Sequence, residues 1–171
     1  MLISMKRSVF DSLDYAALGW ACIEPTIQQI RGKDSTVKSQ VYEHLPLGQR
    51  ALLMFYVLYG HSHSMAEFSW YASYLMLELK AWSEIKSGIR YFGDEAMFLI
   101  YEEIEGVLLA SNRLVEAKSC KVSVMDFDDD SEILENLGRL YELFRKIAPE
   151  TIKRISTYIR NNPDEFVRME D

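Results

Sequence analysis

The chain has 171 residues, of which 49% are hydrophobic and 12% are aromatic. This length and composition exclude a disordered chain and predict one packed helical domain, residues 1–171, with a substantial core. The formal net charge of −7 argues against direct binding to nucleic acid or to an anionic membrane, because both need a basic surface. A basic protein partner is compatible with this charge, and so is simple solubility.

Cysteine usage and hydropathy point to the cytoplasm. Cys22 and Cys120 lie far apart, and neither has the spacing of a CxxC motif or a metal site. We expect two small buried residues in a reducing compartment. The first ten residues place their charges after their apolar residues, unlike a signal peptide. The central apolar run is far shorter than the roughly 20 residues of a membrane span.

Helical spacing of apolar residues begins over residues 11–31, where Pro25 is expected to divide the helix into two pieces. Gly32 suits the C-terminal cap of the second piece. A short helix is expected at about residues 35–42.

The central segment, residues 45–79, contains the strongest core pattern. Residues 51–59 are apolar without a break, so a helix there must be surrounded by protein. Pro46 suits its first turn, and Gly60 is expected to end it. Ser64 and Glu67 have the spacing of a capping box, which predicts a second core helix over residues 64–79.

The second half of the chain predicts further helices. A short one covers residues 82–91, and a longer one, capped by Asp94, covers about residues 95–111. Residues 112–124 are ambiguous between helix, loop and short strand. New helices are expected to begin at Ser131, Pro149 and Pro163. The chain is therefore expected to be all-α, a compact single-domain multi-helix bundle of roughly seven to nine mostly short helices.

The residues most typical of a metal site are His61, His63 and Glu67. On a helix, His63 and Glu67 would face the same way, one turn apart. A further ligand would come from a neighbouring helix: Glu102, Glu103 or Glu105. Against this, the Glu-x-x-His pairs of helical di-iron proteins are absent from the sequence, and Glu67 already serves the capping box. The alternative is two loop histidines, one of them hydrogen-bonded to a helix end.

No other set of residues indicates catalysis. The sequence has no Gly-x-Ser-x-Gly elbow and no glycine-rich phosphate loop. Its many carboxylates include no pair whose environments would separate their pKa values. We therefore name no catalytic residue and no cofactor.

An acidic cluster surrounds the helix start at Ser131. Its members are Asp126, Asp128, Asp129, Asp130, Glu132 and Glu135. Acids at the start of a helix stabilise the positive end of its dipole, which explains some of them. Six acids in ten residues exceed that need, so the second explanation is an anionic surface for a basic partner.

Aromatic residues form a second candidate surface. Trp70 and Tyr74 share a helix face that is separate from the apolar stripe containing Phe68 and Leu75. If exposed, these two aromatic side chains would indicate contact with a second subunit or another helix.

Four segments carry a resemblance to a known family. They are Leu45-Pro46-Leu47-Gly48-Gln49, the aromatics that follow Phe68, an Ile-x-x-Gly-Ile-x-x-Phe-Gly-Asp-Glu-Ala pattern at residues 85–96, and a Tyr-Ile-x-x-Asn-Pro-x-x-Phe pattern at residues 158–166. From about residue 41 onward, the chain resembles a family of bacterial helical domains whose best-known member is described as a DNA-mimic protein.

This resemblance implies an all-helical fold, often dimeric, without known catalysis. In the DNA-mimic member, surface acids take the place of DNA phosphates and occupy a DNA-binding regulator, but those acids cannot be matched here position by position. The family usually has an Asn-Gly-Gly-Phe-x-Gln-like turn before the second core helix. Here residues 63–68 keep only the phenylalanine, so a function carried by that turn would be missing.

We therefore expect a non-enzymatic, acidic, cytoplasmic interaction protein that binds a basic or DNA-binding protein partner, with a homodimer as the assembly that the resemblance implies. Two alternatives stay open. One is a metal-dependent helical-bundle enzyme that uses His61, His63 and Glu67. The other is an immunity-like or chaperone-like structural binder, in which shape rather than charge decides the partner.

Overall fold

The structure is a computed structural model that describes residues 2–117 and 131–170. Eight α-helices account for most of these residues, and a two-stranded parallel sheet joins the two ends of the chain. The all-α prediction is confirmed, and the number of helices in the described ranges agrees with the expectation. The side chains of residues 112–117 and 131 are not part of this description.

The N-terminal part consists of β1 (Ile3–Lys6), α1 (Arg7–Ser12), α2 (Tyr15–Ile30) and α3 (Ser35–Glu43). The expected break at Pro25 is wrong, because α2 continues through this proline. Leu18, Cys22 and Ile23 of α2 are fully buried, so packing along the helix outweighs the one hydrogen bond that a proline removes. Gly32 has a φ of 69° and follows the helix end, as expected of a C-terminal cap.

The central part consists of α4 (Leu47–Tyr59) and α5 (Met65–Ser73), followed by one π-helical turn, η1 (Tyr74–Glu78). Residues 51–59 of α4 lie in the core or pack against it, as the unbroken apolar run predicted. The Ser64 hydroxyl accepts from the Glu67 backbone N–H at 3.2 Å, which confirms this half of the capping box. The second core helix differs from its prediction only in its last turn, which is π-helical.

The C-terminal part consists of α6 (Trp82–Tyr91), α7 (Glu95–Ala117), α8 (Ser131–Asn161), a 3₁₀ turn, η3 (Pro163–Glu165), and β2 (Val167–Glu170). Helices α7 and α8 are longer than the sequence indicated, with 23 and 31 residues. No new helix starts at Pro149, because α8 runs through it. Buried side chains continue on both sides of this exposed proline, at Phe144, Ala148 and Ile155.

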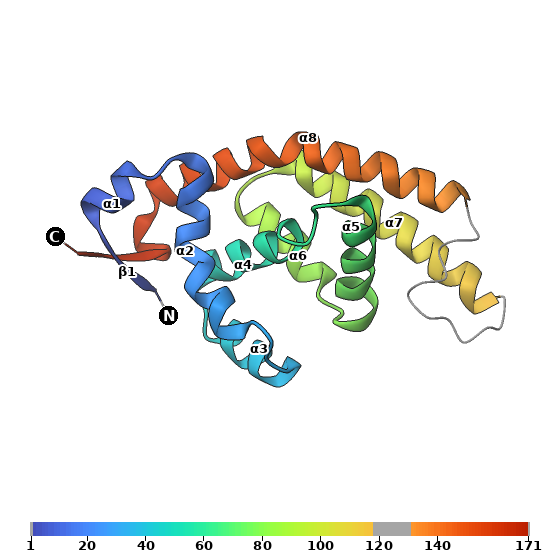
Figure 1. Cartoon of the computed structure of the whole chain (residues 1–171), viewed down its shortest axis with the longest axis horizontal. Helices are drawn as coiled ribbons and strands as arrows, with labels where there is room; N and C mark the ends of the chain where they lie inside the picture. Colours follow the sequence, from blue (N-terminus) through green and yellow to red (C-terminus); the bar gives the residue numbers. More distant parts are fainter. Residues whose placement is uncertain (1, 118–130, 171) are drawn as a thin grey trace.

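Helix α8 spans the long axis of the molecule, and the other elements pack below it (Figure 1). Helix α7 packs against α8 on the side of its N-terminus, and α2 packs against it nearer its C-terminus. Helices α4 and α6 pack closely together; a Cβ on Gly88 of α6 would lie 3.1 Å from the Ala51 carbonyl oxygen of α4. Both ends of the chain lie at the same end of the molecule (Figure 1).

The small sheet is the element that the sequence prediction missed. Ile3 pairs with Val167 and Ser4 with Arg168, so the two ends of the chain form a parallel ladder. Met5 and Val167 are buried, whereas Ser4 and Arg168 are exposed. Each four-residue strand alternates apolar and polar residues, which is the signal that could have indicated it.

The core is one hydrophobic cluster with members from β1 at one end of the chain to β2 at the other. Among the helices that the structure describes, none combines the length and the apolar character that a membrane span requires.

Candidate functional site

The two histidines of the proposed metal site differ in their surroundings. The His61 ring stacks on Tyr71 with centroids 3.8 Å apart and planes 5° apart, and its Nδ1 donates to the Val57 carbonyl at 2.9 Å. His61 therefore closes the C-terminal end of α4, as the loop-histidine alternative describes. His63 is exposed, and no hydrogen bond joins its side chain to another described residue.

The carboxylates that could have completed a metal site are paired with basic side chains instead. Lys86 lies 2.5 Å from a Glu102 oxygen and 2.6 Å from a Glu105 oxygen, and Arg139 lies 2.8 Å from Glu103. In the described ranges, no three His, Cys, Asp or Glu side chains are grouped in a way that could hold a metal ion. The metal hypothesis gains no support from these positions.

The acidic cluster is only partly within the described residues. Asp126, Asp128, Asp129 and Asp130 lie outside them, and so does Cys120. Glu132 and Glu135 lie in the first two turns of α8, and both are exposed. Neither forms an ion pair with another residue that the structure describes.

The aromatic surface predicted around Trp70 is present. Trp70 is 46% exposed and stacks on Tyr74 with centroids 5.5 Å apart and planes 2° apart. Phe68 and Leu75 are buried on the other side, as the two-face interpretation expects. Tyr71 lies between Trp70 and His61 and contacts both rings.

Several of the residues that carry the family resemblance are buried. Gln49 is completely buried, and its Nε2 donates to the Phe166 carbonyl at 2.7 Å and to the Cys22 carbonyl at 3.2 Å. A Cβ on Gly48 would lie 2.8 Å from the Phe166 ring. Asp94 is buried and caps α7 by accepting from the Met97 N–H at 3.1 Å. These positions determine the fold and indicate no chemistry.

Buried titratable groups of the core are held in their neutral forms. Burial raises the pKa of the Cys22 thiol to about 12, so this residue is a poor nucleophile. Burial also raises the pKa of the Tyr56 and Tyr101 hydroxyls, which have no hydrogen-bond partner among the described residues. Because neither hydroxyl is hydrogen-bonded to a described base, neither tyrosine has the contact that activates a nucleophile.

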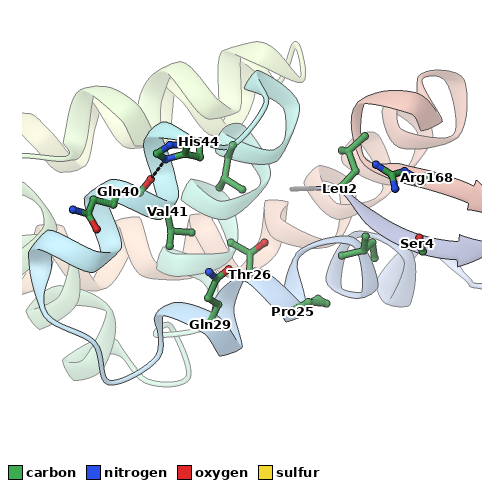
Figure 2. A pocket seen from close by; sticks show the side chains of 11 residues that line it. Leu2, Ser4, Pro25, Thr26, Gln29, Gln40, Val41, His44 and Arg168 are labelled. Atoms are coloured by element: carbon green, nitrogen blue, oxygen red, sulfur yellow. Dashed lines mark hydrogen bonds between the residues drawn. The ribbon is translucent and has the colours of Figure 1, made fainter.

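A cavity that the sequence did not predict lies between β1, α2 and α3 (Figure 2). Its volume is about 730 Å³. Its apolar wall is formed by Leu2, Ile3, Pro25, Val41 and Leu45, and its polar groups come from Ser4, Thr26, Gln29, Gln40, His44 and Arg168. The sequence contained no local signal for it, because its lining comes from four separate segments, residues 2–4, 25–29, 40–45 and Arg168, that only the fold brings together.

Comparisons with known proteins do not identify a relative. No protein-family model, no curated protein and no solved structure matches this chain. The resemblance to the DNA-mimic family therefore stays a prediction from the residues.

Proposed function

We propose that this protein is a non-enzymatic, cytoplasmic interaction protein that binds a basic protein surface through the acidic residues at the start of α8. The observation that carries the proposal is the exposure of Glu132 and Glu135 without an ion-pair partner among the described residues. They continue the run of Asp126, Asp128, Asp129 and Asp130, and no basic residue interrupts it.

Several other acids have structural roles, unlike Glu132 and Glu135. Asp14, Asp34 and Asp94 cap helices by accepting backbone N–H groups at 2.8 to 3.1 Å. Side chains elsewhere pair with Glu102, Glu103, Glu105 and Glu165. The helix dipole alone accounts for one or two acids in the first turn of α8, so the longer run supports a role in binding.

The kind of partner follows from charge and from the resemblance. A surface of closely spaced carboxylates attracts clustered Lys and Arg side chains, and DNA-binding proteins carry such clusters. The resemblance to the DNA-mimic family supports a DNA-binding regulator as partner and a homodimer as the assembly. The surface formed by the exposed Trp70 and the half-buried Tyr74 is the candidate contact for a second subunit.

The test is capture of protein partners by the immobilised protein, from a lysate of the cells that produce it, between about 50 and 500 mM salt. The expected result is a partner whose capture falls as salt rises. Capture is also expected to be lost in a neutralised variant with Asn or Gln at Asp128, Asp129, Asp130, Glu132 and Glu135.

A matched control removes the same number of charges elsewhere on the surface. It carries Asn or Gln at five exposed acids outside the cluster: Asp11, Glu43, Glu78, Glu150 and Glu170. This control is expected to retain capture. Equal capture by both variants would contradict binding through the start of α8, and salt-independent capture would favour the structural binder.

The metal-dependent alternative has a separate measurement. Native mass spectrometry of the untagged protein, purified without chelator, reads bound metal and subunit number together. Our proposal expects a metal-free protein; a stoichiometric metal that is lost in His63→Ala would replace it with the metal hypothesis.

A further inference from the structure

The cavity beside the small sheet has the size of a ligand site. It is open to solvent and occupies about 730 Å³ between the start of β1 and helices α2 and α3 (Figure 2). Small-molecule sites in proteins are clefts of about 300–1,000 Å³ with mostly apolar walls and a few polar groups. This cavity has both features and lies at the end of the molecule opposite the start of α8.

The charge of the cavity is opposite to that of the protein as a whole. The chain has 26 acidic residues and a formal net charge of −7, yet no Asp or Glu is among the eleven lining residues. Arg168 contributes a guanidinium group, and His44 contributes an imidazole whose Nδ1 donates to the Gln40 carbonyl. The lining therefore favours an anionic ligand, because it offers donors and one fixed positive charge.

Thr26 contributes a hydroxyl to the lining from the middle of α2. The residue is only 5% exposed. Figure 2 shows its hydroxyl directed toward the space between α2 and Leu2. The hydroxyl adds a neutral hydrogen-bond donor to this part of the cavity.

The apolar lining residues indicate what accompanies the anionic group. Leu2, Val41 and Leu45 contribute apolar side chains to the lining. A hydrocarbon chain or ring would bury apolar surface there, at about 25 cal/mol per Å² removed from water. A fully polar anion such as phosphate would leave this wall without a partner.

We propose that the cavity binds a small amphiphilic carboxylate. The carboxylate is held by Arg168, and the hydrocarbon part lies against Leu2, Val41 and Leu45. This site is separate from the acidic cluster and does not depend on the function proposed above.

The experiment is titration of the full chain with octanoate, followed by amide chemical shifts and by calorimetry. Two probes with the same chain length separate the contribution of the negative charge from that of the hydrocarbon chain. Octanol carries no charge, and octylamine carries a positive one. The expected result is saturable binding of octanoate, with the largest shifts at cavity residues, and binding of octanol and octylamine at least about tenfold weaker.

Variants test the assigned residues. Arg168→Gln is expected to weaken octanoate binding at least about tenfold, and Val41→Glu, which places a carboxylate on the wall, at least as much. Lys153→Gln removes one exposed positive charge from α8 and is expected to leave the affinity unchanged. Circular dichroism checks that each variant is folded. If Arg168→Gln does not fold, the octanoate affinity of Val41→Glu tests the site alone.

Three results would overturn the proposal. They are no saturable binding of octanoate, equal affinity for octanoate and octanol, or an unchanged octanoate affinity in the folded Arg168→Gln and Val41→Glu variants. Loss of partner capture in the neutralised α8 variant has no effect on this outcome, so the two proposals fail independently.

Discussion

The side-chain amide of Gln49 donates to the backbone carbonyl of Phe166, which lies 117 residues later in the chain, at 2.7 Å. The same nitrogen donates to the Cys22 carbonyl at 3.2 Å, so one buried side chain connects α2, α4 and the turn before β2. Its Oε1 has no partner within the described part of the chain. This contact holds the small sheet, and with it one wall of the cavity, against the helices.

Gln49→Leu is expected to lower the free energy of unfolding by about 1–3 kcal/mol, because two buried carbonyls lose a donor. Loss of the unpartnered Oε1 offsets part of this cost. Urea unfolding followed by circular dichroism measures the change. The control is Gln28→Leu on the exposed face of α2, for which a change within about 0.5 kcal/mol is expected. Equal effects in the two variants would show that the buried amide has no special role.

Two glycines are expected to respond to alanine with opposite signs. A Cβ on Gly48 would lie 2.8 Å from the Phe166 ring, so Gly48→Ala is expected to destabilise the fold by about 1–3 kcal/mol. A Cβ on Gly106, within α7, would meet no atom within 4 Å. Gly106→Ala is therefore expected to stabilise the protein by up to about 1 kcal/mol through helix propensity. Thermal unfolding of both variants tests this pair, and a shift in the same direction would contradict the packing described at Gly48.

Lys86 links α6 to α7 through Glu102 and Glu105. Hydrogen bonds to Glu102 and then to Glu105 raise the pKa of Lys86 above its ordinary value of 10.5. The stabilising contribution is therefore complete below the pKa of an unfolded lysine and is lost as the pH rises through the higher folded value. Lys86→Met is expected to cost no more than about 1 kcal/mol at neutral pH, since Glu102 is 45% exposed and solvent screens the pair.

The difference between wild type and Lys86→Met is expected to stay constant from about pH 8 to 10 and to shrink as the pH rises above about 10.4, the pKa of an unfolded lysine. Urea unfolding at a series of pH values on both sides of this pKa measures the difference. A difference that does not shrink above this pKa would mean that lost packing of the lysine side chain, rather than its charge, causes the effect.

Cys22 is expected to resist alkylation in the folded protein. It is fully buried in α2, and burial raises the pKa of its thiol to about 12, so the thiolate is scarce at neutral pH. Peptide mapping after iodoacetamide treatment is expected to show Cys22 unmodified in the native protein and modified after denaturation. Rapid modification of the native protein would contradict the packing of α2 against the core.

Local sequence patterns predicted much of the fold. The unbroken apolar run predicted the buried helix α4, and the caps at Ser64 and Asp94 predicted where α5 and α7 begin. The prolines misled the prediction, because Pro25 and Pro149 lie inside continuous helices. A proline removes one hydrogen bond, and the buried residues on both sides of it decide whether the helix continues.

Features that depend on distant residues were not predictable from local patterns. The pairing of Ile3 with Val167 joins the two ends of the chain, and four-residue strands give too short an alternation to identify. The cavity has the same origin, since Thr26, Val41 and Arg168 meet only in the folded chain. The histidine hypothesis considered spacing along one helix, whereas His61 is fixed by stacking on Tyr71.

We propose that the acidic start of α8 binds the same basic surface with which its partner binds DNA. The most direct measurement is capture of the partner in the presence of increasing amounts of duplex DNA at fixed salt. The account predicts that DNA displaces the partner from the wild-type protein, because both compete for the same basic surface. Capture that stays constant as DNA is added would contradict it.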